Sequence, residues 1–79
     1  MKLELINGDF SQAETINLIT QMYQVKIKFH EDKVKNSHNE EDIKMRERKI
    51  KLLQNNLADA RVQIKNGDES FHIHSDINL

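Results

Sequence analysis

The sequence predicts an α+β fold in the order β-α-α-β, in which a long antiparallel helical hairpin is flanked by two short strands that pair antiparallel. Three observations predict this fold. Both ends of the chain alternate apolar and polar residues, as half-buried strands do. Between them lie two long segments without glycine or proline, whose apolar residues recur at helical spacing. Only a few residues separate these segments, so two neighbouring antiparallel helices are expected.

The first strand is predicted at residues 2–6, where Leu3 and Leu5 flank Glu4 in regular alternation. The tripeptide Asn7-Gly8-Asp9 follows directly. Asparagine, glycine and aspartate tolerate the backbone angles of turns, so this tripeptide is predicted to end the strand.

The first helix is predicted at residues 11–35, beginning at the capping-box pattern Ser11-Gln12-Ala13-Glu14. Its apolar residues form two rows. One row is Leu18, Met22, Val25 and Phe29, and the other is Ile16, Ile19, Tyr23, Ile27 and Val34, with His30 within it. Together the rows cover more than half of the helix circumference, which is wider than packing on one neighbour requires. The sequence therefore predicts a helix that is buried on two sides.

The second helix is predicted at residues 38–66. Ser37-His38-Asn39-Glu40 repeats the capping-box spacing at its start, and Gly67 is predicted to end it in the left-handed cap conformation. Its apolar residues form a seam with the three-and-four spacing of coiled-coil packing. The seam is Ile43, Ile50, Leu53, Leu57, Ala60 and Ile64, with Arg46 at the missing position and Met45 and Leu52 on a weaker flank.

The second strand is predicted at residues 70–78. Four apolar residues, Phe71, Ile73, Ile77 and Leu79, alternate there with His72, His74, Asp76 and Asn78. An antiparallel helical hairpin brings the end of the first strand beside the start of this one. The two strands are therefore expected to pair antiparallel.

The order of the elements and the phrase Leu5-Ile6-Asn7-Gly8-Asp9-Phe10-Ser11 resemble small uncharacterised bacterial proteins of β-α-α-β design. The resemblance covers the whole chain. It implies no activity, and it assigns no role to any residue.

Composition limits how the chain is stabilised. Its 79 residues predict a single domain over residues 1–79, and only 37% of them are hydrophobic, so the core must be thin. The chain contains no cysteine, which excludes disulfides, thiolate metal sites and a cysteine nucleophile. Regular helix packing and oligomerisation remain as the means of stabilising so small a protein.

Charge and hydropathy bear on location and partners. No apolar run is typical of a signal peptide or long enough to span a membrane, so a cytoplasmic location is expected. Twelve basic and 13 acidic residues give a formal net charge of −1, which provides no overall attraction to nucleic acid or anionic lipid.

The leading hypothesis is a non-enzymatic interaction or structural module that forms a homodimer through the first helix. Two strands offer too little area to cover a helix of about 36 Å, and a large exposed apolar patch usually marks an interaction site. The contact is predicted at Leu18, Met22, Val25 and Phe29. Two hairpins would then form a four-helix bundle, and the strand edges of the copies could also pair. The alternatives are a monomer in which the sheet covers this row, or a row that binds a different, unidentified protein.

A second hypothesis is divalent-metal binding, with zinc as the candidate ion. His72, His74 and Asp76 share one face of the second predicted strand, and imidazole and carboxylate groups are zinc ligands. His30, His38 or a second copy would complete the site. The sequence favours the simpler interpretation that these residues form the polar face of an amphipathic strand.

A third hypothesis is nucleic-acid binding through Lys44, Arg48 and Lys51, which share a face of the second helix. Nearby acidic residues offset this charge through i,i+4 pairs, which favours a solvated helix face. No pattern of nucleophile, base and acid predicts an enzyme, since Ser11 and Ser37 are interpreted as helix caps.

Overall fold

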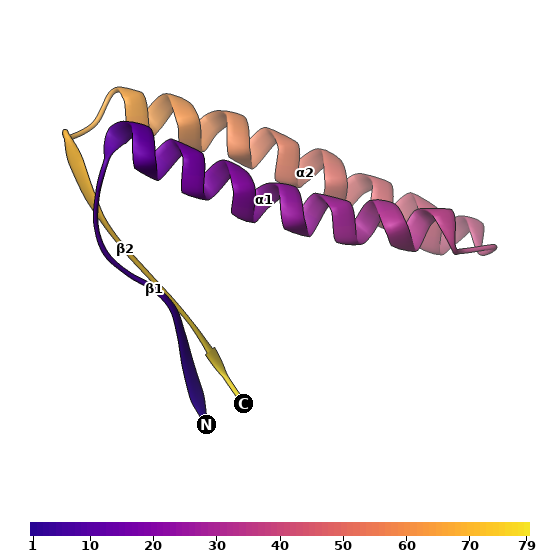
Figure 1. The fold of residues 1–79 in the computed structure, drawn as a ribbon. Coiled ribbons are helices and arrows are strands. Elements are labelled where there is room, and N and C mark those ends of the chain that lie inside the picture. Colours follow the sequence, from indigo (N-terminus) through magenta and orange to yellow (C-terminus); the bar gives the residue numbers. More distant parts are fainter.

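The structure is a computed structural model that describes residues 1–79. Its elements follow the order β1 (Lys2–Ser11), α1 (Gln12–Lys35), α2 (Glu40–Lys65) and β2 (Ser70–Asn78), which confirms the predicted β-α-α-β fold. The helices form an antiparallel hairpin (Figure 1). The two strands leave the same end of this hairpin and pair antiparallel as a two-stranded ribbon.

The prediction that Asn7-Gly8-Asp9 ends the first strand is wrong. β1 continues through this tripeptide to Ser11 and is ten residues long. Each of the three residues has a partner in β2, namely His74, Ile73 and His72 in turn. Cross-strand hydrogen bonding, which depends on a segment more than sixty residues away, therefore overrides the local preference for a turn.

A β-bulge at Leu5 determines which side chains of β1 share a face. The register shifts between Glu4 and Ile6, and Leu5 has no partner in β2. Because side chains alternate along a strand, Leu3 and Ile6 would lie on opposite faces of a regular strand. The extra residue at the bulge places both on the same face. One face of the ribbon thus collects apolar residues, Leu3, Ile6, Phe10, Phe71, Ile73 and Ile77, which we call the apolar face of the ribbon.

The capping box predicted at the start of α1 is confirmed. The Glu14 backbone N–H donates to the Ser11 hydroxyl over 3.2 Å, and the Ser11 backbone N–H donates to the Glu14 carboxylate over 2.9 Å. The hydrogen bond from the Ser11 backbone N–H lowers the pKa of Glu14, because it stabilises the ionised carboxylate, and the Ser11 hydroxyl lowers this pKa further.

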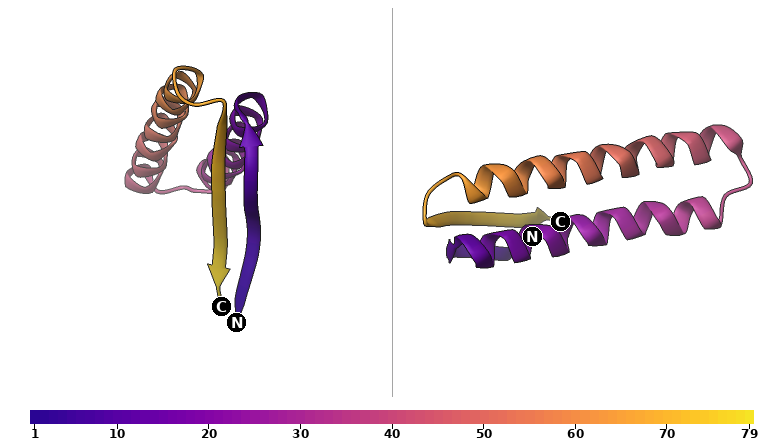
Figure 2. Two further views of the ribbon diagram at one scale, coloured as in Figure 1. Left: turned by 90° about the vertical axis from the view of Figure 1, so that its left-hand side faces the viewer. Right: turned by 90° about the horizontal axis from the view of Figure 1, so that it is seen from above.

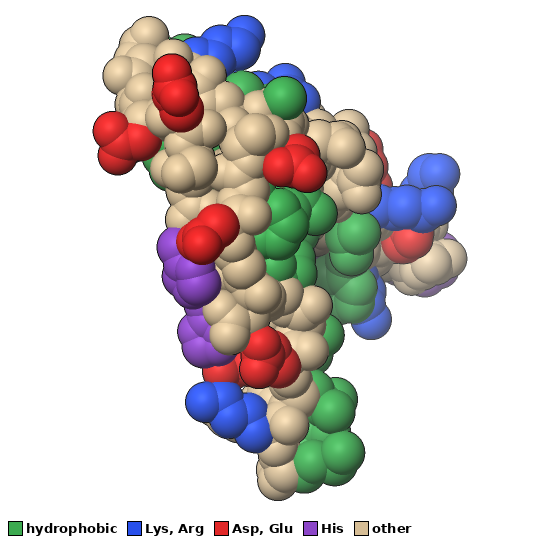
Figure 3. Space-filling model, turned by 60° about the vertical axis from the view of Figure 1, so that its left-hand side comes forward, with side chains coloured by type: hydrophobic (Ala, Val, Ile, Leu, Met, Phe, Trp, Pro, Cys, Tyr) green, Lys and Arg blue, Asp and Glu red, His purple; other side chains and the backbone are tan.

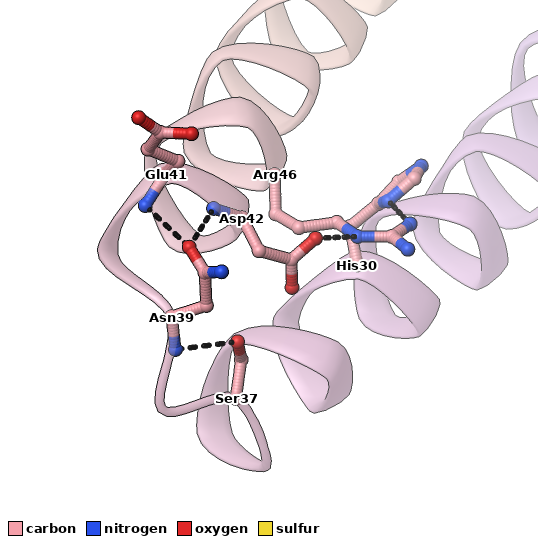
Figure 4. Close-up of polar contacts among 6 residues, drawn as sticks. All are labelled: His30, Ser37, Asn39, Glu41, Asp42 and Arg46. Atoms are coloured by element: carbon pink, nitrogen blue, oxygen red, sulfur yellow. Dashed lines mark hydrogen bonds and ion pairs between the residues drawn. The ribbon is translucent and has the colours of Figure 1, made fainter.

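The second helix begins at Glu40 and not at His38. Its cap is Asn39, whose side-chain oxygen accepts from the backbone N–H of Glu41 over 2.9 Å and of Asp42 over 3.2 Å (Figure 4). The predicted cap, Ser37, instead accepts from the Asn39 backbone N–H within the connecting loop. Asparagine and serine both cap helices well, so the loop conformation decides which of them does.

Gly67 does not adopt the predicted left-handed conformation, since no glycine in the structure has a positive φ. The position is crowded instead. A Cβ added to Gly67 would lie 3.0 Å from Cζ of Phe71 and 3.1 Å from the backbone oxygen of Gln63. Glycine therefore allows the Phe71 ring at the start of β2 to pack against the last turn of α2.

The predicted seam of α2 is confirmed as the contact between the helices. Leu53, Leu57 and Ile64 are the buried apolar residues of the protein, and the other seam residues are half-buried. From α1, the half-buried row is Ile16, Ile19, Tyr23, Ile27 and Val34, with His30. At the ribbon end, the Arg61 guanidinium donates from Nε and Nη2 to the Thr20 hydroxyl, at 3.1 and 2.9 Å.

The molecule is L-shaped, with principal dimensions of 45, 35 and 13 Å, and the two helices lie side by side across the shortest of these (Figures 1 and 2). The ribbon extends away beneath α1 (Figure 2) and leaves an open angle between the strands and the helices (Figure 1). Only four of 79 residues are buried, so a single copy has almost no core. Neither α1 nor α2 combines the length and the apolar character that a membrane span requires.

Candidate interaction surface

The predicted contact row of α1 is largely open to solvent. Met22 is 37% exposed, Phe29 is 54% exposed and Val25 is 71% exposed, while Leu18 is half-buried. The prediction that α1 is buried on two sides is therefore wrong for one copy of the chain. The ribbon lies near α1 only at the first turn of the helix and diverges from the rest of it (Figure 1). It therefore leaves this row uncovered.

Apolar residues of α2 extend this row across the hairpin. A hollow of about 290 Å³ opens between the helices, and we call it the hairpin hollow; its lining is Lys26, His30, Lys49, Leu52 and Leu53. Residues three or four apart share a helix face. Met22 and Phe29 are four and three residues from Lys26, and Met45 is four residues from Lys49. Met22, Phe29 and Met45 therefore lie on the side of the hairpin where the hollow opens.

We call this side of the hairpin the contact face. It comprises Leu18, Met22, Val25 and Phe29 of α1 with Met45 and Leu52 of α2. The apolar face of the ribbon adds to it, because its side chains lie on the side of the ribbon turned toward the helices (Figure 3). Leu3 and Ile77, which pair near the free end of the ribbon, are 37% and 41% exposed. The exposed apolar surface thus spans both parts of the molecule.

The proposed nucleic-acid residues lie together on α2. Lys44, Arg48 and Lys51 line a second hollow of about 260 Å³ with Glu47, and none of its lining residues is hydrophobic. The shared face predicted from their spacing is therefore present. Glu47 lines the same hollow, so its negative charge offsets part of theirs. Nucleic-acid binding through this hollow stays a prediction.

The proposed metal ligands do not converge within one copy. His72 Nδ1 lies 3.0 Å from Oδ1 of Asp9, while His74 Nε2 lies 3.4 Å from Oδ2 of Asp76. Asp76 also forms an ion pair with Lys2, at 3.1 Å. No group of three or more histidine, cysteine, aspartate or glutamate side chains lies close enough together to hold a metal ion.

The other two histidines lie away from the ribbon. His30 is on α1, and His38 is in the connection at the far tip of the hairpin (Figure 1). Neither therefore completes a set with His72 and His74 in a single copy. Zinc binding between two copies stays a prediction.

A polar contact between the helices was not predicted from the sequence. Arg46 Nη1 lies 3.0 Å from His30 Nδ1, which therefore accepts the hydrogen bond in the unprotonated state (Figure 4). Burial lowers the pKa of His30, and the positive charges of Arg46, Lys49 and Lys26 lower it further. Arg46 also contacts Asp42, with 3.8 Å between its Nε and the carboxylate.

The sequence held only a partial signal for this contact. Asp42 and Arg46 are four residues apart on α2, a spacing that favours an ion pair. His30 lies within an apolar row of α1, at nearly the same distance from the connection between the helices as Arg46, so an antiparallel hairpin brings the two residues to a similar level.

No protein family, curated protein or solved structure matches this chain. The resemblance to small bacterial β-α-α-β proteins therefore stays a hypothesis.

Proposed function

We propose that this protein is a non-enzymatic interaction module that forms a homodimer by burying the contact face against a second copy. One observation carries the proposal: the hairpin and the ribbon are each a single layer, they diverge from one another, and a single copy buries only four residues (Figure 1). Stable domains bury the apolar sides of their elements between two packed layers. A second copy would supply the layer that this chain lacks.

The exposed area agrees with this interpretation. The accessible surface is 6193 Å², whereas a folded monomer of 9.3 kDa typically exposes about 5,000 Å². The excess of about 1,200 Å² exceeds the roughly 800 Å² that each partner buries in a standard interface. A dimer formed through the contact face would therefore bring the exposed area of each copy to an ordinary value.

The shape of the molecule supports the same conclusion. The radius of gyration is 15.2 Å, while a compact chain of 79 residues has about 12 Å. Two such hairpins facing one another would pack four helices in two layers, as in a four-helix bundle. The apolar face of the ribbon lies on the same side and would extend the interface.

We infer that the partner on the contact face is a second copy of the chain, because two-fold dimers with self-complementary interfaces are the commonest soluble oligomers. The decisive measurement is absolute mass by light scattering on a size-exclusion column over a range of chain concentrations. A mass of twice 9.3 kDa is expected. A mass of 9.3 kDa at every concentration up to the millimolar range would reject the proposal.

A further inference from the structure

The hairpin hollow differs from an ordinary groove between helices in its charge. It is bordered by Lys26 and His30 of α1 and by Lys49 of α2, and Arg46 reaches His30 from α2. No carboxylate lies within 4.0 Å of the Lys26 or Lys49 ammonium group, since neither residue is part of an ion pair. Three full positive charges therefore lie close together, and Asp42 is the sole carboxylate paired with any of them.

His30 adds a hydrogen-bond donor to this group. Its Nδ1 accepts from the Arg46 guanidinium, so in the neutral imidazole the proton resides on Nε2. No hydrogen bond within the protein uses His30 Nε2. The site thus offers two ammonium groups and one imidazole N–H, all of which are donors.

The floor of the hollow is apolar. Leu53 is 9% exposed and closes the base, while Leu52 is 59% exposed and forms a wall that reaches solvent. Ligand sites typically combine an apolar lining with a few polar groups that fix orientation. At about 290 Å³, the hollow lies at the small end of the range for such sites.

We propose that the hairpin hollow binds a small amphipathic anion, with an anionic head group held by Lys26, His30 and Lys49 and a short apolar tail lying on Leu52 and Leu53. The head group is a phosphate or carboxylate, because both supply oxygen acceptors for ammonium and N–H donors. Binding relieves the mutual repulsion of the cations around His30. The site goes beyond the proposed homodimer, but Leu52 belongs to both the hollow and the contact face, so the ligand and a second copy compete for this wall of the hollow.

The second basic hollow provides an internal comparison. It holds Lys44, Arg48 and Lys51, so its positive charge is similar. It also contains the Glu47 carboxylate and has no apolar lining residue, and all of its residues come from one helix. An anion attracted by charge alone would use either hollow, whereas an amphipathic anion selects the hairpin hollow.

The test is a titration of the isotope-labelled full chain with hexyl phosphate at pH 7, followed by amide chemical shifts. Hexanol, which has only the apolar tail, and inorganic phosphate, which has only the anionic group, are titrated separately as controls. Shifts are expected at residues 26–30 and 49–53, with affinity about tenfold or more above that for either half. Binding also raises the pH at which the His30 ring protonates, which a ring-proton titration measures.

Two matched double variants separate a specific site from general electrostatics. Lys26→Gln/Lys49→Gln is expected to weaken hexyl phosphate binding about tenfold or more, since it removes two charged hydrogen bonds. Lys44→Gln/Lys51→Gln removes the same charge from the other hollow and is expected to change affinity by less than about twofold. Circular dichroism confirms that both variants remain folded. Equal losses in the two variants, or shifts spread over the whole chain, would overturn the proposal.

Vesicles of phosphatidylcholine containing phosphatidylglycerol distinguish a lipid from a free ligand. Co-sedimentation that requires Lys26 and Lys49 identifies a lipid head group as the source. Hexyl phosphate binding without co-sedimentation identifies a free small molecule. Light scattering on the same samples shows whether the ligand also changes self-association, because Lys26 lies beside the contact face.

Discussion

Arg46 and His30 meet across the helical hairpin, with 3.0 Å between Nη1 of the guanidinium and Nδ1 of the imidazole. The contact joins α2 to α1 in the half of the hairpin nearer its tip. It places an always-charged side chain against one whose charge changes near neutral pH. The acceptor role of Nδ1 ends when His30 is protonated, so the contact makes the stability of the hairpin depend on pH.

Stability is expected to decrease on acidification below about pH 6.5. Burial and three nearby cations lower the pKa of His30 in the folded state from its ordinary value of 6.5. The unfolded chain therefore binds the proton first as the pH falls, which favours unfolding. The stabilisation is complete above pH 6.5 and is lost as the pH falls from there to the folded pKa. Thermal unfolding followed by circular dichroism at fixed chain concentration between pH 5 and 8 measures this dependence.

His30→Gln is the matched control for this pH dependence, because glutamine accepts from Arg46 without titrating. Its melting temperature should vary less than that of the wild type between pH 5 and 7. Glu14, whose pKa is also lowered, affects stability only below its ordinary value of 4.5 and stays outside this range. An unchanged slope in His30→Gln would show that another group is responsible.

The capping hydrogen bonds of α2 come from Asn39 and not from Ser37, so the two residues should differ in their effect on stability. Asn39 accepts from two backbone N–H groups of the first turn, at 2.9 and 3.2 Å. Asn39→Ala is therefore expected to destabilise the protein by about 1 kcal/mol. Ser37→Ala removes one loop hydrogen bond at 3.3 Å and should have less than about half that effect. Chemical denaturation measures both, and a larger loss in Ser37→Ala would contradict the cap assignment.

Substitution of Gly67 is predicted to destabilise the protein by steric overlap. A Cβ at Gly67 would meet Phe71 at 3.0 Å and the Gln63 carbonyl at 3.1 Å, and such crowding typically costs about 1–3 kcal/mol. Gly8→Ala is the control, because its added Cβ would meet Phe10 at an ordinary 3.6 Å. The free energy of unfolding of each variant gives the comparison.

Relief by a second substitution would identify Phe71 as the cause. Gly67→Ala combined with Phe71→Leu should lose less stability than the sum of the two single changes. If Gly67→Ala is as stable as the wild type, the ring does not pack against the last turn of α2 in solution.

Charged substitutions on the contact face are predicted to abolish self-association. Met22→Glu and Phe29→Glu place a carboxylate in the proposed interface, where its desolvation opposes dimerisation. Both residues are exposed in a single copy, at 37% and 54%, so helix content should be nearly unchanged. Light scattering should give 9.3 kDa at micromolar concentrations.

Gln24→Glu makes the same change in charge on the exposed polar side of α1 and should leave self-association intact. Circular dichroism verifies the fold of all three variants. A Met22→Glu or Phe29→Glu chain that still has twice the monomer mass would place the interface elsewhere, for example at the strand edges of the ribbon.

Zinc uptake is predicted to be weak in a single copy. His72 and His74 contact different carboxylates on the outer face of the ribbon, and neither forms part of a set of three ligands. Calorimetric titration should therefore give similar weak binding for the wild type and for His72→Ala/His74→Ala. Tight binding by the wild type that the double variant loses would indicate a site shared between copies.

The sequence by itself determined the order of the elements, the cap of α1 and the seam of α2. Each of these depends on residues that are neighbours along the chain. The Ser11–Glu14 capping box needs only four consecutive residues, and the seam around Leu53 and Leu57 needs only a helical period. The second strand was predicted for the same reason, since apolar and polar residues alternate over residues 70–78 with Ser75 as the one exception.

The tertiary structure alone decided the features that join distant segments. Asn7-Gly8-Asp9 forms part of a strand because β2 pairs with it. Position 67 requires glycine because the Phe71 ring packs closely against it. The His30–Arg46 contact and the open angle of the ribbon likewise depend on how elements meet in space. Local preferences amount to about 1 kcal/mol per residue or less, so hydrogen bonding and packing between distant segments outweigh them. For this reason the contact face was predicted on α1, while its extension over α2 and the ribbon required the structure.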